Sequence, residues 1–300
     1  MPKAKKKKRA NFFVLLINQI RQDKKTFWFY LALQCAIVTV ALRNIFTARW
    51  ENVFTCLLAE LLLFIPPLVE HSFKLKLPAT LEILAYIFVF CAEILGEIGN
   101  FYQRFAFWDV MLHTVNGFMF AAFGFCLVDI FNKNKKFRFE LSPFFLAMTA
   151  FCFSMTIGVL WEFFEYLADT VLHTDMQKDA IRTALHSVSL PNDLGQKVTH
   201  INGINKTLIY TESGQVIELN GYLDLGITDT IKDLFVNFIG ATVFSVIGFF
   251  YVKHRGKGPI AGQFIPVYRD ANGNGIPDEQ ETTNLLPPAA ADQQQEGTEE

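Results

Sequence analysis

The sequence predicts an all-α polytopic membrane protein with about six transmembrane helices and a small outer segment that contains a β-hairpin. The 300 residues are 51% hydrophobic and 19% charged, whereas a soluble domain carries about a quarter of charged residues. Phe alone supplies 32 residues, and the apolar residues are gathered into runs of spanning length. This composition excludes a purely soluble enzyme, a fibrous chain and a wholly disordered chain.

Six apolar runs are long enough to cross a bilayer, and together they predict a membrane domain over 26–252. The second run carries Glu60 near its middle and Pro66-Pro67 at its end, so an interfacial or broken helix is the alternative there. The runs cover 26–42, 53–69, 79–98, 109–131, 143–167 and 233–252.

Polar segments flank this domain at both ends. Segment 1–25 joins a lysine-rich stretch to an apolar stretch too short to cross, which is typical of a cationic interfacial helix or of a disordered basic tail. Segment 253–300 is predicted to be a flexible tail. Most Lys and Arg residues near the span ends fall on the side of segment 1–25, so we expect both termini in the cytoplasm.

Residues 170–228 form the one sizeable outer segment, between the fifth and sixth spans. Three β-branched runs, which begin at Lys197, Thr207 and Val216, are separated by Asn-Gly and Ser-Gly pairs. This pattern predicts a hairpin or a three-stranded meander.

Acidic and imidazole side chains lie at four ends of the predicted spans, where a charge is costly and usually marks function. Strict alternation of the spans places all four ends on one side of the bilayer, so we expect a single outward-facing polar pocket beneath the outer segment. The four groups are Glu93 and Glu97; Asp109 and His113; Glu162, Glu165 and Asp169; and Asp229, Asp233 and Asn237.

Carboxylates gathered in a poorly hydrated pocket are partly protonated or share a cation. A divalent cation suits the residues present: Mg, Mn or Ca by the oxygen ligands, or zinc or iron with the imidazole. The alternative is that the carboxylates are solvated at the headgroup level and that some cap helix N-termini. The catalytic candidates are His113 and Glu165, the metal candidates are Asp109, Glu162, Asp169, Asp229 and Asp233, and the substrate-binding candidates are Glu93, Glu97 and Asn237.

A second cation site is predicted in the tail, where a twelve-residue loop meets the calcium-loop pattern. Pro277 stiffens this loop and no amphipathic helix flanks it, so a polar turn is the alternative. Its oxygen ligands are Asp270, Asn272, Asn274, Asp278 and Glu281.

Three motifs resemble the YjdF-like inner-membrane proteins of bacteria: FWDVMLH at 107–113, WEFFEY at 161–166 and DTIKDLFVNFIGA at 229–241. The resemblance covers about 90–250 and implies a bacterial cytoplasmic membrane location, but no reaction. VanZ-like membrane proteins, some of them linked to teicoplanin resistance, are more distantly similar in their polar pattern, here Asp109, His113, Glu165, Asp233, Asn237 and Gly240.

These observations favour a cell-envelope protein whose pocket binds a cation and a lipid-linked substrate. Phosphate-ester chemistry there depends on the cation, because the site is poor in Arg. Membrane lipids are the expected partners, and nothing points to nucleic acid. The alternatives are a cation or proton-coupled transporter, with Glu60 and Glu97 as carriers, and a non-catalytic membrane scaffold.

Overall fold

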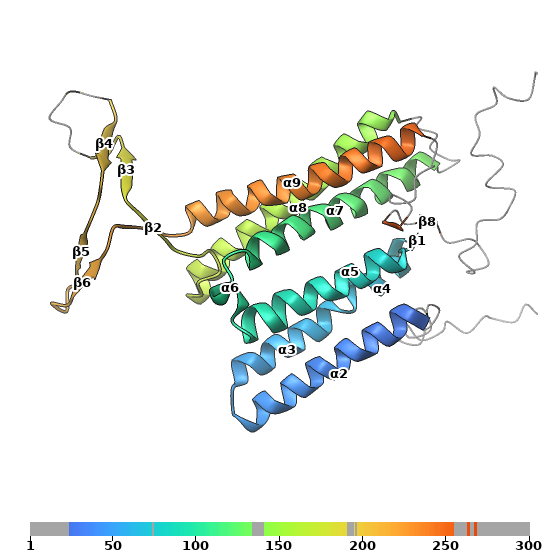
Figure 1. Cartoon of the computed structure of the whole chain (residues 1–300), viewed down its shortest axis with the longest axis horizontal. Coiled ribbons are helices and arrows are strands. Elements are labelled where there is room, and N and C mark those ends of the chain that lie inside the picture. Colours follow the sequence, from blue (N-terminus) through green and yellow to red (C-terminus); the bar gives the residue numbers. More distant parts are fainter. Residues whose placement is uncertain are drawn as a thin grey trace, which may run out of the picture.

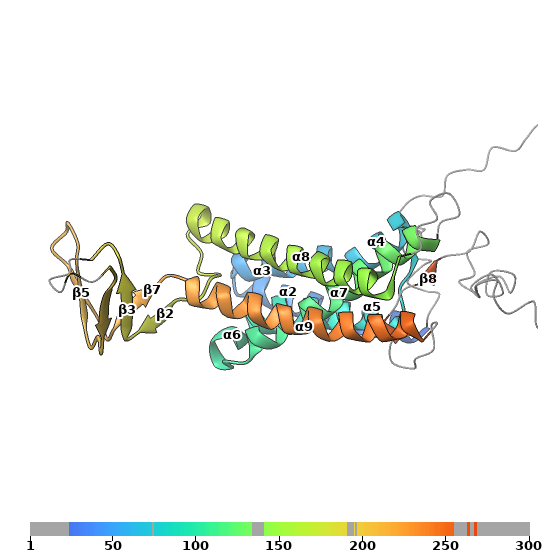
Figure 2. The ribbon, with the colours of Figure 1, turned by 90° about the horizontal axis from the view of Figure 1, so that it is seen from above.

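The computed structural model describes residues 24–73, 75–133, 141–190, 195, 197–254, 263–264 and 267–268. Its body consists of long helices that lie side by side, and a group of short strands projects from one end of them (Figures 1 and 2). Six of the described helical segments are long and apolar enough to cross a membrane. The predicted fold class is therefore confirmed.

The first three spans form one half of the body around a core of Ile37, Leu63 and Tyr86. The second span is a broken helix, because Pro66-Pro67 lack the backbone N–H groups that a continuous helix needs. The helix is interrupted at Leu63–Phe64, but the two helical pieces together are still long enough to cross a membrane. The elements are α2 (Lys24–Phe46), α3 (Trp50–Leu62), α4 (Ile65–Phe73), α5 (Ala79–Val89) and the π-helix η1 (Phe90–Ile98).

The wide turns of η1 end the third span. The amide of Gly99 donates to the carbonyl of Ile94, five residues earlier, at 2.9 Å. The indole of Trp108 donates to the Cys91 carbonyl within this helix at 3.3 Å. Such π segments are frequent near functional sites, and this one carries Glu93 and Glu97.

The last three spans form a three-helix bundle whose elements follow the short helix α6 (Phe101–Arg104). They are α7 (Trp108–Lys133), α8 (Pro143–Leu172) and α9 (Ile227–Lys253). The backbones of α7 and α9 are in contact: a Cβ atom built on Gly117 would lie 2.1 Å from the Asn237 carbonyl oxygen. Only glycine allows such an approach, as is common where membrane helices pack.

The described strands of the outer segment form three antiparallel pairs, β2–β7, β3–β4 and β5–β6. The hairpin predicted from the runs at Thr207 and Val216 is β5–β6. The three-stranded meander is wrong, because β4 pairs with β3, which precedes it, and not with β5. Beyond β4 the amide of Ile204 donates to the carbonyl of Thr183 at 2.8 Å, which holds the chain against the start of β3. The strands are β2 (Ala180–Arg182), β3 (Ala184–Ser187), β4 (Thr199–Asn202), β5 (Thr207–Tyr210), β6 (Val216–Leu219) and β7 (Tyr222–Asp224).

At the opposite end of the body, β1 (Leu75–Lys76) pairs with β8 (Val267–Tyr268). The ring of Phe264 packs against Phe118, with ring centroids 5.1 Å apart. These described residues of segment 253–300 thus pack against the body, and the flexibility of the segment as a whole stays a prediction. Residues 1–23 of the predicted basic segment and the calcium-like loop at 270–281 lie outside the described residues.

Candidate functional site

The four polar helix ends predicted to share one side lie at the same end of the body. The last turns of η1 and α8 and the first turns of α7 and α9 meet at the end from which the strands project, here called the strand end (Figures 1 and 2). Their common side follows from the alternating direction of successive spans.

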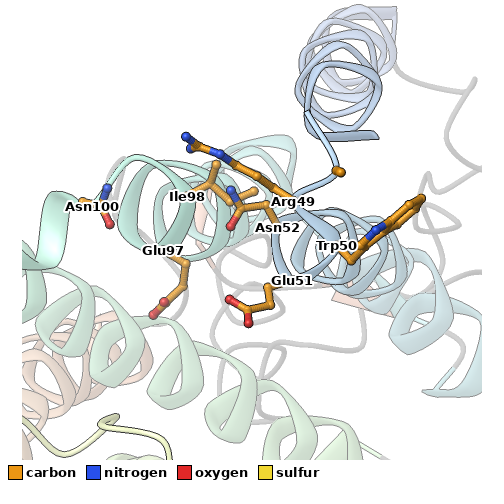
Figure 3. Close-up of a pocket in the computed structure, with 8 residues that line it drawn as sticks. Arg49, Trp50, Glu51, Asn52, Glu97, Ile98 and Asn100 are labelled. Atoms are coloured by element: carbon orange, nitrogen blue, oxygen red, sulfur yellow. The ribbon is translucent and has the colours of Figure 1, made fainter. Parts of the chain in front are cut away.

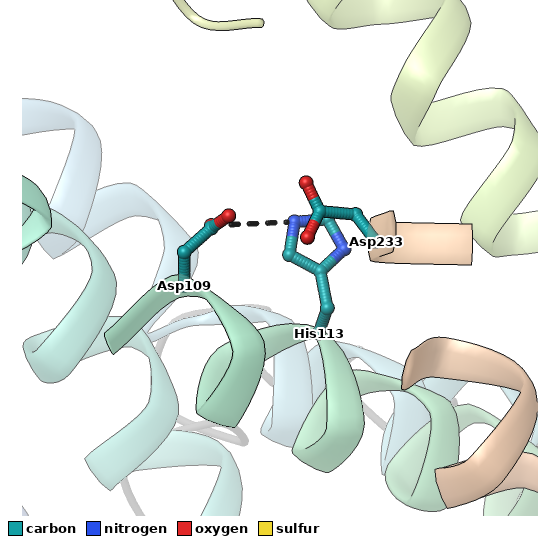
Figure 4. Close-up of side chains that lie close together, drawn as sticks. All are labelled: Asp109, His113 and Asp233. Atoms are coloured by element: carbon teal, nitrogen blue, oxygen red, sulfur yellow. Dashed lines mark ion pairs between the residues drawn. The ribbon is translucent and has the colours of Figure 1, made fainter. Parts of the chain in front are cut away.

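A histidine and two carboxylates from α7 and α9 form the candidate metal centre, Asp109–His113–Asp233. Each residue offers one ligand atom, and these atoms lie within 4.8 Å of one another. Nε2 of His113 lies 3.6 Å from Oδ1 of Asp109, one helical turn away on α7, and the Asp233 carboxylate faces the imidazole (Figure 4). Asp233 is 1% exposed, and its Oδ1 has no hydrogen-bond partner among the described residues.

A third helix contributes Glu162 to this centre. Its Oε1 lies 3.9 Å from Nδ1 of His113. Glu162 is 4% exposed, and neither of its carboxylate oxygens accepts a hydrogen bond from any residue that the structure describes. Buried polar atoms are nearly always paired, so an unpaired buried carboxylate indicates a place for a cation or a proton.

Glu165 lies one turn further along α8 and is also buried. Its carboxylate accepts a hydrogen bond from the indole of Trp161 at 2.8 Å. This bond fixes the carboxylate against its own helix, while the second oxygen keeps the capacity to exchange a proton.

Lys232 belongs to the site, although the predicted sixth span, 233–252, left it just outside the helix. Its ammonium lies 3.4 Å from Oδ1 of Asp229 and 3.8 Å from oxygens of both Asp109 and Asp233. The side chain is 41% exposed and marks the open rim of the site. The sequence placed the start of the sixth span at Asp233, whereas α9 begins at Ile227, and this places Lys232 within the helix.

Asp169 and Asp229 fasten the beginning of the outer segment to the helix ends. Both oxygens of Asp169 accept hydrogen bonds, from Thr174 and from the amides of Met176 and Gln177, at 2.7–2.8 Å. Oδ2 of Asp229 accepts from the amide of Lys178 at 2.9 Å. The structure therefore gives Asp169 an anchoring role, apart from the Asp109–His113–Asp233 group.

Asn237, predicted to bind substrate, joins the three helices below the centre. It accepts a hydrogen bond from the side chain of Asn116 at 3.4 Å and donates to the Met155 sulfur at 3.6 Å. Gly158 makes room for it, because a Cβ atom there would lie 2.6 Å from Nδ2. Asn237 is 1% exposed, so its position is that of a packing residue.

Glu97 lies apart from the centre, in a pocket between the α2–α3 turn and the end of η1 (Figure 3). Arg49 and Glu51 line the same pocket, and the carboxylates of Glu51 and Glu97 lie on the same side of it. Glu93, one turn earlier on η1, is half-buried.

Tyr102 on α6 connects these acidic groups and was missed by the sequence analysis. Its ring packs on Gly96, where a Cβ atom would lie 2.4 Å from Cε2 of Tyr102. Burial raises the pKa of the Tyr102 phenol well above its ordinary value, and nearby carboxylates raise it further. Those carboxylates come from both halves of the body: Glu97, Asp109, Glu93 and Glu165.

Comparison with known proteins gives a family. The family model described as "Predicted membrane protein (DUF2238)" matches residues 28–254. An uncharacterized protein of Thermotoga maritima is 29% identical over 109 residues, which are 36% of this chain and 54% of that protein. The chain thus spans about half the length of this curated relative. No solved structure matches the chain, and the similarity to VanZ-like proteins stays a prediction.

Proposed function

Because the chain belongs to the DUF2238 family of predicted membrane proteins, which is the YjdF family, we propose that it is an integral membrane protein that binds a divalent cation at the strand end. The centre would use the carboxylates of Asp109 and Asp233 and the imidazole of His113. The observation that carries the proposal is the convergence of three ligand atoms within 4.8 Å around a buried aspartate. That aspartate has an oxygen without a hydrogen-bond partner in the described chain.

The charge balance of the site supports a divalent cation. Lys232 supplies one ammonium to a group of buried or half-buried carboxylates, and one positive charge does not balance them. Removing ions from water costs several kcal/mol each unless a partner compensates. Oxygen and imidazole ligands together suit Mn, Fe or Zn better than Ca. The carboxylates are Asp109, Glu162, Glu165, Asp229 and Asp233.

We further propose that the substrate is a lipid-linked molecule with an anionic headgroup. The site lies at the ends of the spans, where a headgroup resides. A bound cation would polarise a phosphate oxygen, and the exposed ammonium of Lys232 would attract the same group. Glu165 would move a proton beside it.

We assign the protein to the bacterial cytoplasmic membrane, with both termini in the cytoplasm. The start of α2 and the end of α9 lie at the end opposite the strands (Figure 1), and the lysines at these helix ends, Lys24 and Lys253, support a cytoplasmic side by the positive-inside rule. A green fluorescent protein fused after the full chain should therefore fluoresce. An alkaline phosphatase inserted after Gly203 should be active. A dark fluorescent protein together with an inactive phosphatase would show the opposite orientation in the membrane.

The metal content of the detergent-purified full chain tests the proposed centre. All proteins carry Asp270→Asn and Glu281→Gln, which remove the calcium-like loop as a source of metal. We expect about one ion per chain in this background and a loss of the ion in Asp233→Asn and in His113→Ala. Asp129→Asn, at the other end of α7, is the matched control and should keep the ion. A well-folded parent protein without metal would refute the proposal.

A proton-coupled transporter is the second candidate, because of Glu60 in the other half of the body. Its Oε1 is buried on α3 without a hydrogen-bond partner in the described part of the chain, and buried carboxylates in spans are typical of proton relays. This function would be favoured if the parent protein binds no metal and carries protons into proteoliposomes, and if Glu60→Gln abolishes that proton flux. Loss of stability alone in all of these variants would favour a scaffold.

A further inference from the structure

Two histidines face each other across the outer strands. His186 on β3 and His200 on β4 are directly opposite in the antiparallel register. Their Nδ1 atoms are 2.9 Å apart, and their ring centroids are 4.8 Å apart. Both side chains are exposed, so solutes reach them freely.

We infer that His186 and His200 form a second metal site, for a transition-metal ion such as Cu²⁺ or Ni²⁺, that is independent of the proposed centre at the strand end. Metal to imidazole nitrogen bonds are about 2.0–2.1 Å long, so two such ligands at a right angle lie about 2.9 Å apart. Right angles between neighbouring ligands are those of square-planar and octahedral ions, and Cu²⁺ and Ni²⁺ prefer imidazole in these geometries. The observed nitrogen separation equals that spacing.

The hydrogen bond between the two rings is compatible with this assignment. One Nδ1 donates and the other accepts, so the accepting ring carries its proton on Nε2. If the donor ring moves its proton to Nε2, both Nδ1 lone pairs become available to an ion. No proton is lost from the pair in this change, and no other group has to accept one.

The strand pair presets the ligands and leaves space for the ion. Side chains two residues apart on a strand share a face, so the His186–His200 pair shares its face with Ala184 and Asn202, which also lie opposite each other. The methyl group of Ala184 leaves room for water ligands, and Asn202 adds an amide oxygen on that face. A site made by two neutral imidazoles has little affinity for Mg²⁺ or Ca²⁺, which prefer oxygen ligands. This ligand preference separates it from the centre on α7 and α9.

Copper titration of the full-length protein, purified in detergent with a tag that contains no histidine, tests the inference. The parent protein carries His113→Gln and Asp233→Asn, so that the membrane centre contributes no ligands. We expect one Cu²⁺ per chain, with hyperfine splitting from two nitrogens in the electron paramagnetic resonance spectrum. His186→Gln and His200→Gln should each weaken binding roughly 10²-fold, because a single imidazole loses the advantage of chelation.

Non-additivity and a control variant distinguish this site from scattered surface histidines. The double variant should weaken binding by less than the product of the two single effects, because either substitution alone already removes the chelate. His173→Asn changes a histidine at the C-terminal end of α8 and should leave copper binding unchanged. Copper binding that persists unaltered in the His186→Gln/His200→Gln protein would overturn the inference. The proposed centre on α7 and α9 would be unaffected by that result, since its test uses the other ligands.

Discussion

The backbone contact between α7 and α9 makes Gly240→Ala a sharp test of the architecture that builds the site. A Cβ atom at residue 240 would lie 2.0 Å from the carbonyl oxygen of Thr114 and 2.9 Å from the amide nitrogen of Phe118. Ordinary contacts begin at about 3.4 Å, so α7 and α9 would have to separate by about 1.4 Å along the shorter line. Both neighbouring atoms belong to the backbone, which cannot rotate away as a side chain does.

Overpacking of this kind costs about 1–3 kcal/mol, and we expect Gly240→Ala at the upper end of that range because backbone must move. The same displacement reaches the candidate centre. Thr114 follows His113 directly, and Asp233 lies two turns before Gly240 on α9, so separation of the helices widens the 4.8 Å spacing of the ligand atoms. Cation binding is therefore expected to fall together with the free energy of unfolding.

The assay is reversible unfolding by sodium dodecyl sulfate in mixed micelles, followed by circular dichroism, with metal content measured on the same samples. Gly248→Ala on the same helix is the matched control. Its Cβ atom would meet ring atoms of Phe125 at 3.0 Å, and a ring adjusts at a cost of about 1 kcal/mol or less. Equal stability and equal metal content in the Gly240→Ala and Gly248→Ala proteins would refute the α7–α9 contact as described.

Three further substitutions probe the site. Glu162→Gln removes a buried charge whose oxygens have no hydrogen-bond partner in the described chain, so unfolding in detergent should show equal or greater stability while a metal titration shows weaker cation binding. Asp169→Asn weakens the charge-assisted hydrogen bonds from Met176 and Gln177, each worth about 1.5–3 kcal/mol. Limited proteolysis should then cut 173–178 faster, and an unchanged rate would contradict the anchoring role. Because the phenol of Tyr102 has a raised pKa in the folded protein, the unfolded chain releases its proton first, so stability should fall as pH rises above about 10. Tyr102→Phe should remove that part of the fall, as measured by unfolding at pH 9 and pH 11.

Apolar run length and strict alternation were enough to predict the six spans and to place the four polar helix ends on one side of the bilayer. A charge within an apolar run is rare, so Asp109, His113 and Asp233 stood out in the sequence. Their helical spacing predicted shared faces, but only packing order brings α7 and α9 into contact. The sequence also contains the residues that permit this contact, Gly117 and Gly240. A glycine in a span indicates close helix packing, but it does not tell which helix is the neighbour.

The residues that the sequence analysis missed or assigned differently depend on tertiary neighbours. Lys232 was excluded from the sixth span because hydropathy falls where charges begin, whereas helical hydrogen bonding continues through them. The helical spacing of Asn237 from Asp229 and Asp233 suggested a ligand. Its contacts are those of a packing residue, since its side chain lies against Gly158 on another helix. The pairing of β3 with β4 was missed because β3, which contains His186, has no β-branched or aromatic residue that would mark it as a strand.

The order of the helices along the chain also sets when the site can form during synthesis. The α7 and α8 helices reach the bilayer before α9, because a nascent chain inserts and folds from its N-terminus. The first turns of α9 carry Asp229, Lys232 and Asp233, which are costly in lipid and find their partners only against the helices already there. The last helix thus completes the site, and the residues already in the site give the charged side chains of α9 their partners. A nascent chain arrested before Ile227 would hold five spans, no complete centre and outer strands anchored at one end only.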